Sequence, residues 1–329
     1  MATGIVSIAM RNQHAHAVSV ALLWLAAAEY VALVALIVWR LTSFRAEMRA
    51  DLADPRRAFG LFTFVAGTDV LGTRLAADAH HPIAFVLLAV GWLAWVVLGY
   101  AIPWTAVLGR AHRPVLQDAN GTWFVWAVAS QSVAVLSATL EPAVTLGRRE
   151  LALLAVFSWS VGVFLYLGTG ILVAARMLLY PLEPEDLTPP YWVAMGATAI
   201  TVVAGARIVQ MAGAPMVEAT KGLVAGTSVL FWSFGSWLIP VLVAAGVWRH
   251  AVHKVPLRYE PPVWSIVFPL GMYGVSGSLL GQVDHLPIVR GIGDTESWFA
   301  LAAWVAVFAA MLHHLTRLYT AQHEGGTGR

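Results

Sequence analysis

The sequence contains no cysteine and few charges, and both absences narrow its class. Without cysteine the chain has no disulfide, no thiolate nucleophile and no thiolate-bound zinc or iron–sulfur cluster. Only 12% of its residues are charged, about half the ~25% usual in soluble domains. The net charge of +2 is spread over few residues, and no basic groove with interleaved aromatics indicates nucleic-acid binding. What remains is an apolar chain, 59% hydrophobic, whose natural solvent is lipid.

The histidines and glycines give no support to an enzyme. The eleven histidines fall in loops or near the ends of apolar runs, so a haem held between helices by paired imidazoles is not expected. His80–His81 and His313–His314 are adjacent pairs, which point about 100° apart on a helix and fit a metal poorly. No glycine-rich phosphate loop follows a strand. We therefore expect no catalysis, metal or cofactor.

Apolar runs predict about ten transmembrane helices, because a spanning helix needs about 20 mostly apolar residues. The predicted fold class is an all-α integral membrane protein with a single transmembrane domain over residues 1–329. The runs are 1–10, 17–39, 58–78, 82–104, 120–140, 149–175, 191–213, 222–248, 263–283 and 297–316. The first run is half a span, and we expect the true start of the protein to lie upstream of Met1.

The distribution of Lys and Arg predicts the orientation. One side of the predicted helices holds thirteen of the twenty basic residues, namely Arg40, Arg45, Arg49, Arg56, Arg57, Arg110, Arg113, Arg176, Arg249, Lys254, Arg258, Arg317 and Arg329. That side should be cytoplasmic. Both termini are then inside the cell, residues 317–329 form a short cytoplasmic tail, and the protein lies in the cell (inner) membrane.

A tryptophan recurs at the start of successive odd-numbered spans. Trp123, Trp192 and Trp264 are 69 and 72 residues apart, which is one two-helix hairpin each time. The odd spans are also rich in Gly, Ala, Ser and Thr, whereas the even spans are bulkier. Small and hydroxyl residues allow close helix approach. The pattern predicts five repeated hairpins with the odd helices around a central pore; ordinary helix packing is the alternative.

Three segments resemble the tellurite-resistance/dicarboxylate transporter family, which includes the plant slow anion channels. They are Ala2-Thr3-Gly4-Ile5-Val6-Ser7-Ile8-Ala9, Gly121-Thr122-Trp123-Phe124 with Gln131-Ser132, and Phe268-Pro269-Leu270-Gly271-Met272-Tyr273. The resemblance implies five hairpins, a pore through each subunit and a homotrimer. It also implies small anions as substrates: malate and related dicarboxylates, chloride, nitrate or tellurite.

The resemblance assigns a pore-blocking role to Phe268 in the ninth span. Four residues after the other two repeated tryptophans stand Ala127 and Gly196, so one large ring would face small neighbours. The alternative is a core phenylalanine packed beside a kink at Pro269. Thr122 and Gln131 are expected to donate hydrogen bonds along the path of the anion.

Charged residues within the spans are costly, about 2.5–3.5 kcal/mol each at the bilayer centre, so they need a partner or a function. Arg74 and Arg207 fall at one depth of spans three and seven, and we expect a cationic collar that attracts anions. Asp69 is expected to line the pore with them; the alternative is a structural ion pair, with Arg207 across helices rather than with Arg74, which is five residues away. Glu29 lies in an even span. Asp69 or Glu29 would carry the proton if the protein were a proton-coupled carrier instead of a channel.

Overall fold

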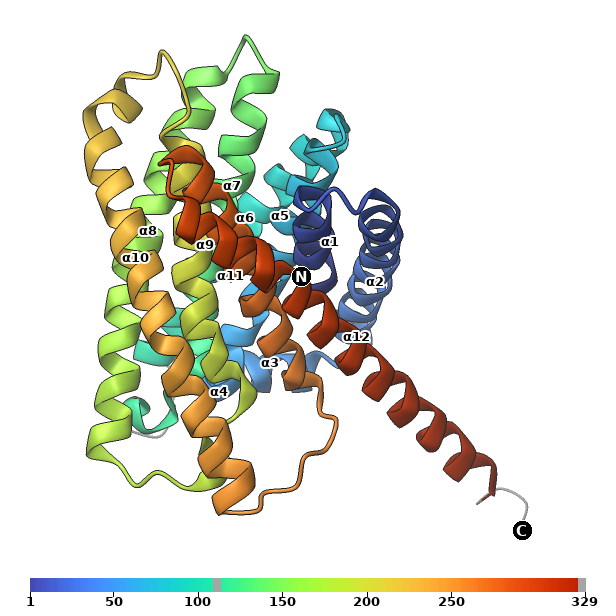
Figure 1. Ribbon diagram of the computed structural model, residues 1–329. Helices are drawn as coiled ribbons and strands as arrows, with labels where there is room; N and C mark the ends of the chain where they lie inside the picture. Colours follow the sequence, from blue (N-terminus) through green and yellow to red (C-terminus); the bar gives the residue numbers. More distant parts are fainter. Residues whose placement is uncertain (109–113, 325–329) are drawn as a thin grey trace.

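The computed structural model describes residues 1–108 and 114–324, and within these ranges the chain forms helices and no strand. Ten of the helices in these ranges form the bundle (Figure 1). They are α1 (Ala2–Asn12), α2 (His16–Ser43), α5 (Phe62–Ala76), α6 (His81–Leu108), α7 (Phe124–Leu140), α8 (Arg148–Leu179), α9 (Val193–Ile208), α10 (Pro215–Val247), α11 (Trp264–Val283) and α12 (Pro287–Glu324). Two short helices, α3 (Arg45–Ala53) and α4 (Pro55–Ala58), connect α2 to α5.

The ten helices are arranged as five hairpins around one axis. Each of α1, α5, α7, α9 and α11 packs against the helix that follows it, and each also packs against the next of the five. Contacts between α11 and α1 close the ring. The helices α2, α6, α8, α10 and α12 form an outer layer around it. The predicted fold class, an all-α membrane protein of repeated hairpins with the odd helices inside, is confirmed.

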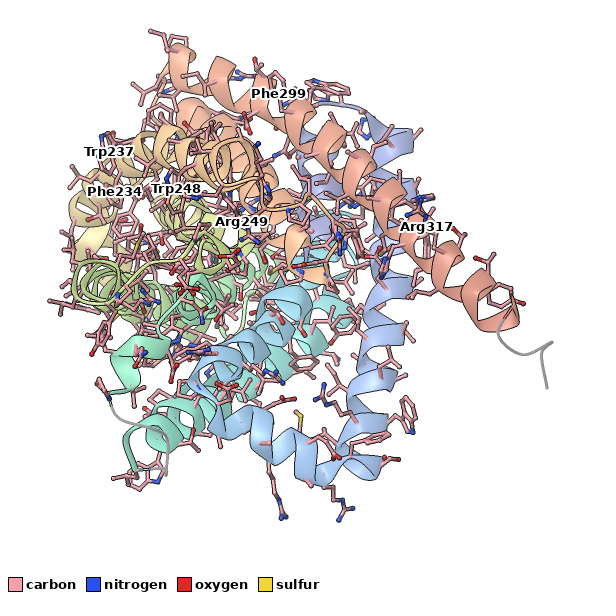
Figure 2. All side chains as sticks on the ribbon, turned by 90° about the horizontal axis from the view of Figure 1, so that it is seen from below. Phe234, Trp237, Trp248, Arg249, Phe299 and Arg317 are labelled. Atoms are coloured by element: carbon pink, nitrogen blue, oxygen red, sulfur yellow. The ribbon has the colours of Figure 1, made fainter. Side chains whose placement is uncertain are left out.

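Residue size explains which helices lie inside. The inner helices α7 and α9 are buried along nearly their whole length, and their buried residues are mainly Ala, Gly, Ser, Thr and Val. The outer helices instead expose large apolar side chains, such as Phe234 and Trp237 of α10 and Phe299 of α12, which Figure 2 shows on the outside of the bundle. In a bilayer these side chains contact lipid, whereas the small residues let the ring helices approach one another closely.

Within the described residues, eight helices are long and apolar enough to cross a membrane. The remaining two members of the ring, α1 and α5, have 11 and 15 residues and fall below that length. Both are nevertheless buried among other helices. α1 packs on α2, α5, α11 and α12, and α5 packs on α1, α2, α6 and α7. The short helices therefore complete the ring from within the protein.

Several regions differ from the sequence-based boundaries: α10 begins at Pro215 rather than 222, and α9 ends at Ile208 rather than 213. α12 begins at Pro287 rather than 297, because Gly293 lies directly on α11; a Cβ at Gly293 would be 2.2 Å from the backbone nitrogen of Ser278. Its glycines and acidic residues made this stretch look like a loop. The helices α3 and α4 were also missed, although Asp54 before Pro55 is a common helix start, and its side chain accepts a hydrogen bond from the Arg56 amide.

The predicted tail, residues 317–329, coincides up to Glu324 with the end of α12, which extends away from the bundle and carries Arg317 (Figures 1 and 2). Residues 325–329, with Arg329, lie outside the described residues, as do Arg110, His112 and Arg113. The single-domain assignment and the cytoplasmic placement of the tail stay predictions.

Candidate functional site

A narrow cavity lies on the axis of the ring, and all five inner helices contribute to its wall. Its volume is about 20 Å³, enough for about one water molecule. The lining residues are Ile5, Ile8, Val70, Thr73, Ser132, Val135, Ile200, Val203, Arg207, Met272 and Val275. The wall is thus apolar except for two hydroxyls and one guanidinium group. We call this space the axial cavity.

The axial cavity opens toward a wide depression at the end of the ring where the inner helices end. We call this depression, of about 470 Å³, the C-side mouth; it is lined by Arg11, Asn12, His14, His16, Arg207, Val275, Ser278, Leu279, Gln282, Arg290 and Asp294. Arg207 and Val275 line both spaces, so they mark the junction. Three arginines against one aspartate give the C-side mouth a formal charge of +2 with neutral histidines.

Arg207 stands at this junction in the last turn of α9. Its Nε is buried and has no hydrogen-bond partner, and among the described residues no carboxylate forms an ion pair with it. A cation near a helix C-terminus is favoured by the helix dipole. An unpaired guanidinium group in an apolar wall attracts anions and repels cations.

Arg74 departs from the predicted collar. It is fully buried but lies outside both linings, because its side chain turns between α1, α2 and α5. Its Nε donates to Ser7 Oγ at 2.9 Å, its second nitrogen to Ser19 Oγ at 3.0 Å and its third to Asp78 Oδ2 at 2.6 Å. Asp78 is four residues further on, in the turn that follows α5, and this spacing brings the two charges together. The two arginines therefore do not form one collar.

Asp69 also departs from its predicted place in the pore lining, since it lies outside the axial cavity and the C-side mouth, and in the described chain no ion pair joins it to Arg207 or Arg74. Its carboxylate is fully buried, and Oδ2 accepts a hydrogen bond from Ser132 Oγ of α7 at 2.8 Å. The other oxygen, Oδ1, has no hydrogen-bond partner. The carboxylate points to α6 at Gly91, where an added Cβ would be 2.1 Å from Oδ1. Asp69 therefore supports the wall of the cavity from behind.

Gln131 and Thr122 occupy different parts of the molecule. Gln131 is buried and points outward to α8, where its Nε2 donates to the Trp159 carbonyl at 3.1 Å. Its neighbour Ser132 faces the cavity, because adjacent residues on a helix are about 100° apart. Thr122 lies at the opposite end of the ring, where its hydroxyl donates to Asn120 Oδ1 at 2.6 Å. Sequence reasoning thus chose the wrong member of the Gln131–Ser132 pair as a lining residue.

Phe268 is completely buried on the side of the axial cavity away from the C-side mouth. It precedes Met272 of the cavity wall by four residues, so both lie on one face of α11. The same step back from Val70, Ser132 and Ile200 of the wall leads to smaller side chains, Ala66, Val128 and Gly196, whereas from Thr73 and Val135 it leads to Asp69 and Gln131, which point to α6 and α8. Phe268 therefore belongs to the inward face of α11, one turn beyond the cavity.

Glu29 lies away from the axis. It lines a lateral groove of about 250 Å³ between α1, α2 and α5, together with Tyr30 and Thr63. Its carboxylate accepts a hydrogen bond from Thr3 Oγ1 at 2.8 Å, and the same hydroxyl accepts one from the Trp304 indole at 3.1 Å. These bonds join the first hairpin to α12, which is a structural role.

A second depression, of about 260 Å³, lies where α7, α9 and α11 begin. We call it the N-side mouth; its charged lining residues, which sequence reasoning missed, are Arg56, Asp118, Arg176, Glu185, Asp186 and Glu260. Arg56 pairs with Asp118 at 2.7 Å and Arg176 with Asp186 at 3.1 Å. Four acids against two arginines give a formal charge of −2. The four acids stand shortly before the repeated tryptophans in the sequence, and this position was the available signal.

Clusters of metal-ligating side chains are not seen within residues 1–108 and 114–324. No group of three or more His, Cys, Asp or Glu side chains there is placed to hold a metal ion.

Comparison with known proteins agrees with this geometry. The sequence pattern of a family described as voltage-dependent anion channels (SLAC1) matches residues 1–312. The uncharacterized membrane protein Rv1735c of Mycobacterium tuberculosis is 68% identical over 152 residues, 46% of this chain and 77% of the relative. Two uncharacterized transporters of Methanocaldococcus jannaschii are also similar. MJ0576 is 24% identical over 291 residues, 87% of this chain and 81% of its own, and MJ0762 is 26% identical over 208 residues, 63% and 58%.

Proposed function

The chain belongs to the voltage-dependent anion channel (SLAC1) family of membrane transporters, and we propose that it conducts small anions along the axis of its five-helix ring. This family consists of channels and transporters rather than enzymes. The path runs from the C-side mouth past Arg207 into the axial cavity, and then past Phe268 to the N-side mouth.

The observation that carries the proposal is the unpaired Arg207 in the wall of the cavity. Burying a charge without a partner is costly, so a protein that keeps one there gains something from it. The guanidinium group offers several N–H donors in a plane that suits carboxylates and other oxyanions. Its place at the junction means that every anion on the axis passes beside it. A counter-ion taken from solution is then the natural partner of Arg207.

Phe268 is the proposed gate. The axial cavity is narrow, and the ring of Phe268 is the largest side chain at the next level of the inward faces. Thr122 at the N-side mouth is proposed to contact the anion as it leaves. Gln131 and Arg74 are proposed to hold the helices in place rather than to touch the anion, because their hydrogen bonds go to other helices.

The finer identity of the transporter follows the resemblance. Malate or a similar dicarboxylate, chloride, nitrate and tellurite are the proposed substrates. A homotrimer in the cell (inner) membrane, with both termini cytoplasmic, is the proposed assembly. The lipid bilayer is the solvent that the exposed apolar outer helices require.

The test is anion flux through purified protein in liposomes, with each of the four anions in turn. Wild type should carry anions, and Arg207→Gln should lower the flux about tenfold or more, since losing one charge-assisted bond costs ~1.5–3 kcal/mol. Arg207→Lys, which keeps the charge, should retain most of the flux. The matched control is Lys221→Gln, a loss of the same charge on α10 away from both mouths.

Absence of flux for all four anions in folded wild-type protein would contradict the proposal. So would an Arg207→Gln variant that transports as well as the Lys221→Gln control. Folding of each variant is checked by its elution as a single species and by its thermal unfolding in detergent.

A proton-coupled carrier is the second candidate. Asp69 is favoured over Glu29 for the proton site, because Asp69 bonds a serine of the axial cavity whereas Glu29 lines the lateral groove. The two mechanisms differ in whether an imposed pH gradient alone drives anion accumulation. A channel responds to the gradient of the anion and to voltage.

A further inference from the structure

Both hydroxyls in the wall of the axial cavity are bonded to Asp69. Thr73 Oγ1 donates to the backbone carbonyl of Asp69 at 2.8 Å, one helical turn earlier. Ser132 Oγ lies 2.8 Å from Asp69 Oδ2 and 2.8 Å from the Ala129 carbonyl. A hydroxyl has a single hydrogen. In this arrangement both hydrogens go to protein oxygens, so the cavity offers an anion only the guanidinium group of Arg207.

The pocket that holds the Asp69 carboxyl group fits tightly around it. The group lies between α5, α6 and α7 with no exposed surface. It fits against α6 only because residue 91 is glycine, since a Cβ there would be 2.1 Å from Oδ1 and 2.9 Å from the carboxyl carbon. Within the described chain, Ser132 is the one side chain that bonds the group. The state of Asp69 is therefore transmitted to Ser132 before any other side chain.

We propose that protonation of Asp69 releases the hydroxyl hydrogen of Ser132 from Asp69 and lets it point into the axial cavity. An anion then binds in the cavity together with the proton on Asp69. An ionised carboxylate only accepts hydrogen bonds, so Ser132 must donate to it. A protonated Asp69 donates its own O–H to Ser132 Oγ. The Ser132 hydrogen is then free for the Ala129 carbonyl or for an anion in the cavity. This inference rests on the proposed function.

The anion should win that choice. A hydrogen bond to an ionised acceptor is roughly twice as strong as one between neutral groups. The step takes one proton from water onto Asp69 Oδ2 and changes no other covalent bond. Thr73 lacks this freedom, because the carbonyl it bonds accepts in either state. Anion transport should accordingly increase as the pH falls.

Among the described residues, Asp69 is the one ionisable group near α5 that bonds Ser132. The others on α5, in the turn after it and on the helices packed against it are Arg11, His16, Glu29, Tyr30, Arg40, Arg74, Asp78, His81 and Tyr100, and Arg207 lies across the cavity. Glu29 bonds Thr3, Tyr30 bonds Thr68 at 3.0 Å, and Asp78 bonds Arg11 and Arg74. The helix α7 contains no ionisable residue. A titration felt by Ser132 is thus assigned to Asp69.

The experiment measures anion flux in liposomes at a series of pH values, equal on both sides, for wild type, Asp69→Asn and Ser132→Ala. Wild-type flux should increase about tenfold from neutral to acidic pH, the effect of one hydrogen bond to a charged acceptor. Asp69→Asn should stay at the high level at every pH, because its amide donates to Ser132 as the protonated acid does. Ser132→Ala should stay low at every pH.

The matched control is Ser137→Ala on the same helix. Ser137 is completely buried, its hydroxyl has no hydrogen-bond partner, and it lies outside the cavity lining. This variant should keep the wild-type pH dependence. His14→Gln/His16→Gln, which removes two imidazoles of the C-side mouth, should keep the ratio of acidic to neutral flux.

Wild-type flux that is independent of pH would overturn the inference and leave the proposed function standing. A pH dependence that survives in Ser132→Ala would do the same, and this comparison decides the matter even if Asp69→Asn fails to fold. Absence of flux at every pH in folded wild type would instead overturn the proposed function, and the inference with it.

Discussion

The two mouths of the ring carry opposite charge. The C-side mouth is lined by three arginines and one aspartate, whereas the N-side mouth is lined by two arginines and four acids. At the N-side, ion pairs occupy both arginines and leave Glu185 and Glu260 without an ion pair among the described residues. An anion therefore meets attraction at one end of the path and repulsion at the other.

The parallel direction of the inner helices accounts for this difference. All five run from the N-side to the C-side, so their dipoles point the same way. Acids are favoured near helix starts and cations near helix ends. Arg11 and Arg207 of the C-side mouth follow this preference, because they lie in the last turns of α1 and α9.

The comparison also separates two sets of arginines. The predicted cytoplasmic side is the N-side, and it holds most of the basic residues of the chain. Several of these, such as Arg40, Arg45 and Arg49, lie on α2 and α3 at the edge of the bundle, outside the mouth. Arg56 and Arg176 belong to the same basic set and do line the N-side mouth, so a count of Lys and Arg does not separate residues at the edge of the bundle from residues of the mouth.

Phe268→Ala should give the largest effect, because it joins the two mouths. Removing the ring should raise anion flux by at least about tenfold, which needs the barrier to fall by only ~1.4 kcal/mol. The readout is flux in liposomes. The matched control is Phe124→Ala, whose buried ring packs on Tyr166 of α8 at 5.4 Å between centroids and so faces away from the axis. Equal flux in the two variants would remove Phe268 from the path.

Glu185→Gln/Glu260→Gln should weaken the contrast between the mouths. The charge of the N-side mouth becomes zero, and anion current driven from that side should rise about twofold at low salt, with the gain lost at high salt through screening. Planar-bilayer currents at equal and opposite voltages measure this. Glu47→Gln, an exposed acid on α3, is the control. An unchanged ratio of the two currents would contradict the prediction.

These currents require protein of known orientation, and the sequence makes that simple. Because the chain has no cysteine, Leu257→Cys introduces a single thiol, at a residue 84% exposed in the loop before α11. A thiol reagent that cannot cross the membrane then labels only the molecules whose N-side faces it.

Asp294→Asn should sharpen the contrast, with the smallest effect. It removes the one acid of the C-side mouth, and the apparent affinity for anions should rise by a factor of about 1.5, as expected for one partly screened charge. The asparagine oxygen can still accept the hydrogen bonds from Gln13 and Ser278. Affinity is read from flux against anion concentration, with Glu218→Gln, an exposed acid outside the lining, as control. A lower affinity would contradict the prediction.

The ring was predictable from sequence, but part of the candidate site was not. Small residues repeated in alternate spans predict which helices lie inside, because small side chains allow close packing between helices. Arg74 was misplaced although its partner Asp78 stood at a favourable spacing of four. The contact between Asp69 and Ser132 joins residues 63 positions apart, and only the packing of α5 on α7 brings them together.

The closure of the ring has a consequence for synthesis. α1 and α11 complete the circle, and Thr3 is bonded to Trp304 and Gln13 to Asp294 across almost the whole length of the chain. Domains generally fold during synthesis, beginning with the N-terminal part of the chain. Here the contacts of the first hairpin with α11 and α12 cannot form until the last hairpin has been synthesised. A chain that stops early has an open crescent of helices, whose gap lipid can fill, and not a conducting path across the cell boundary.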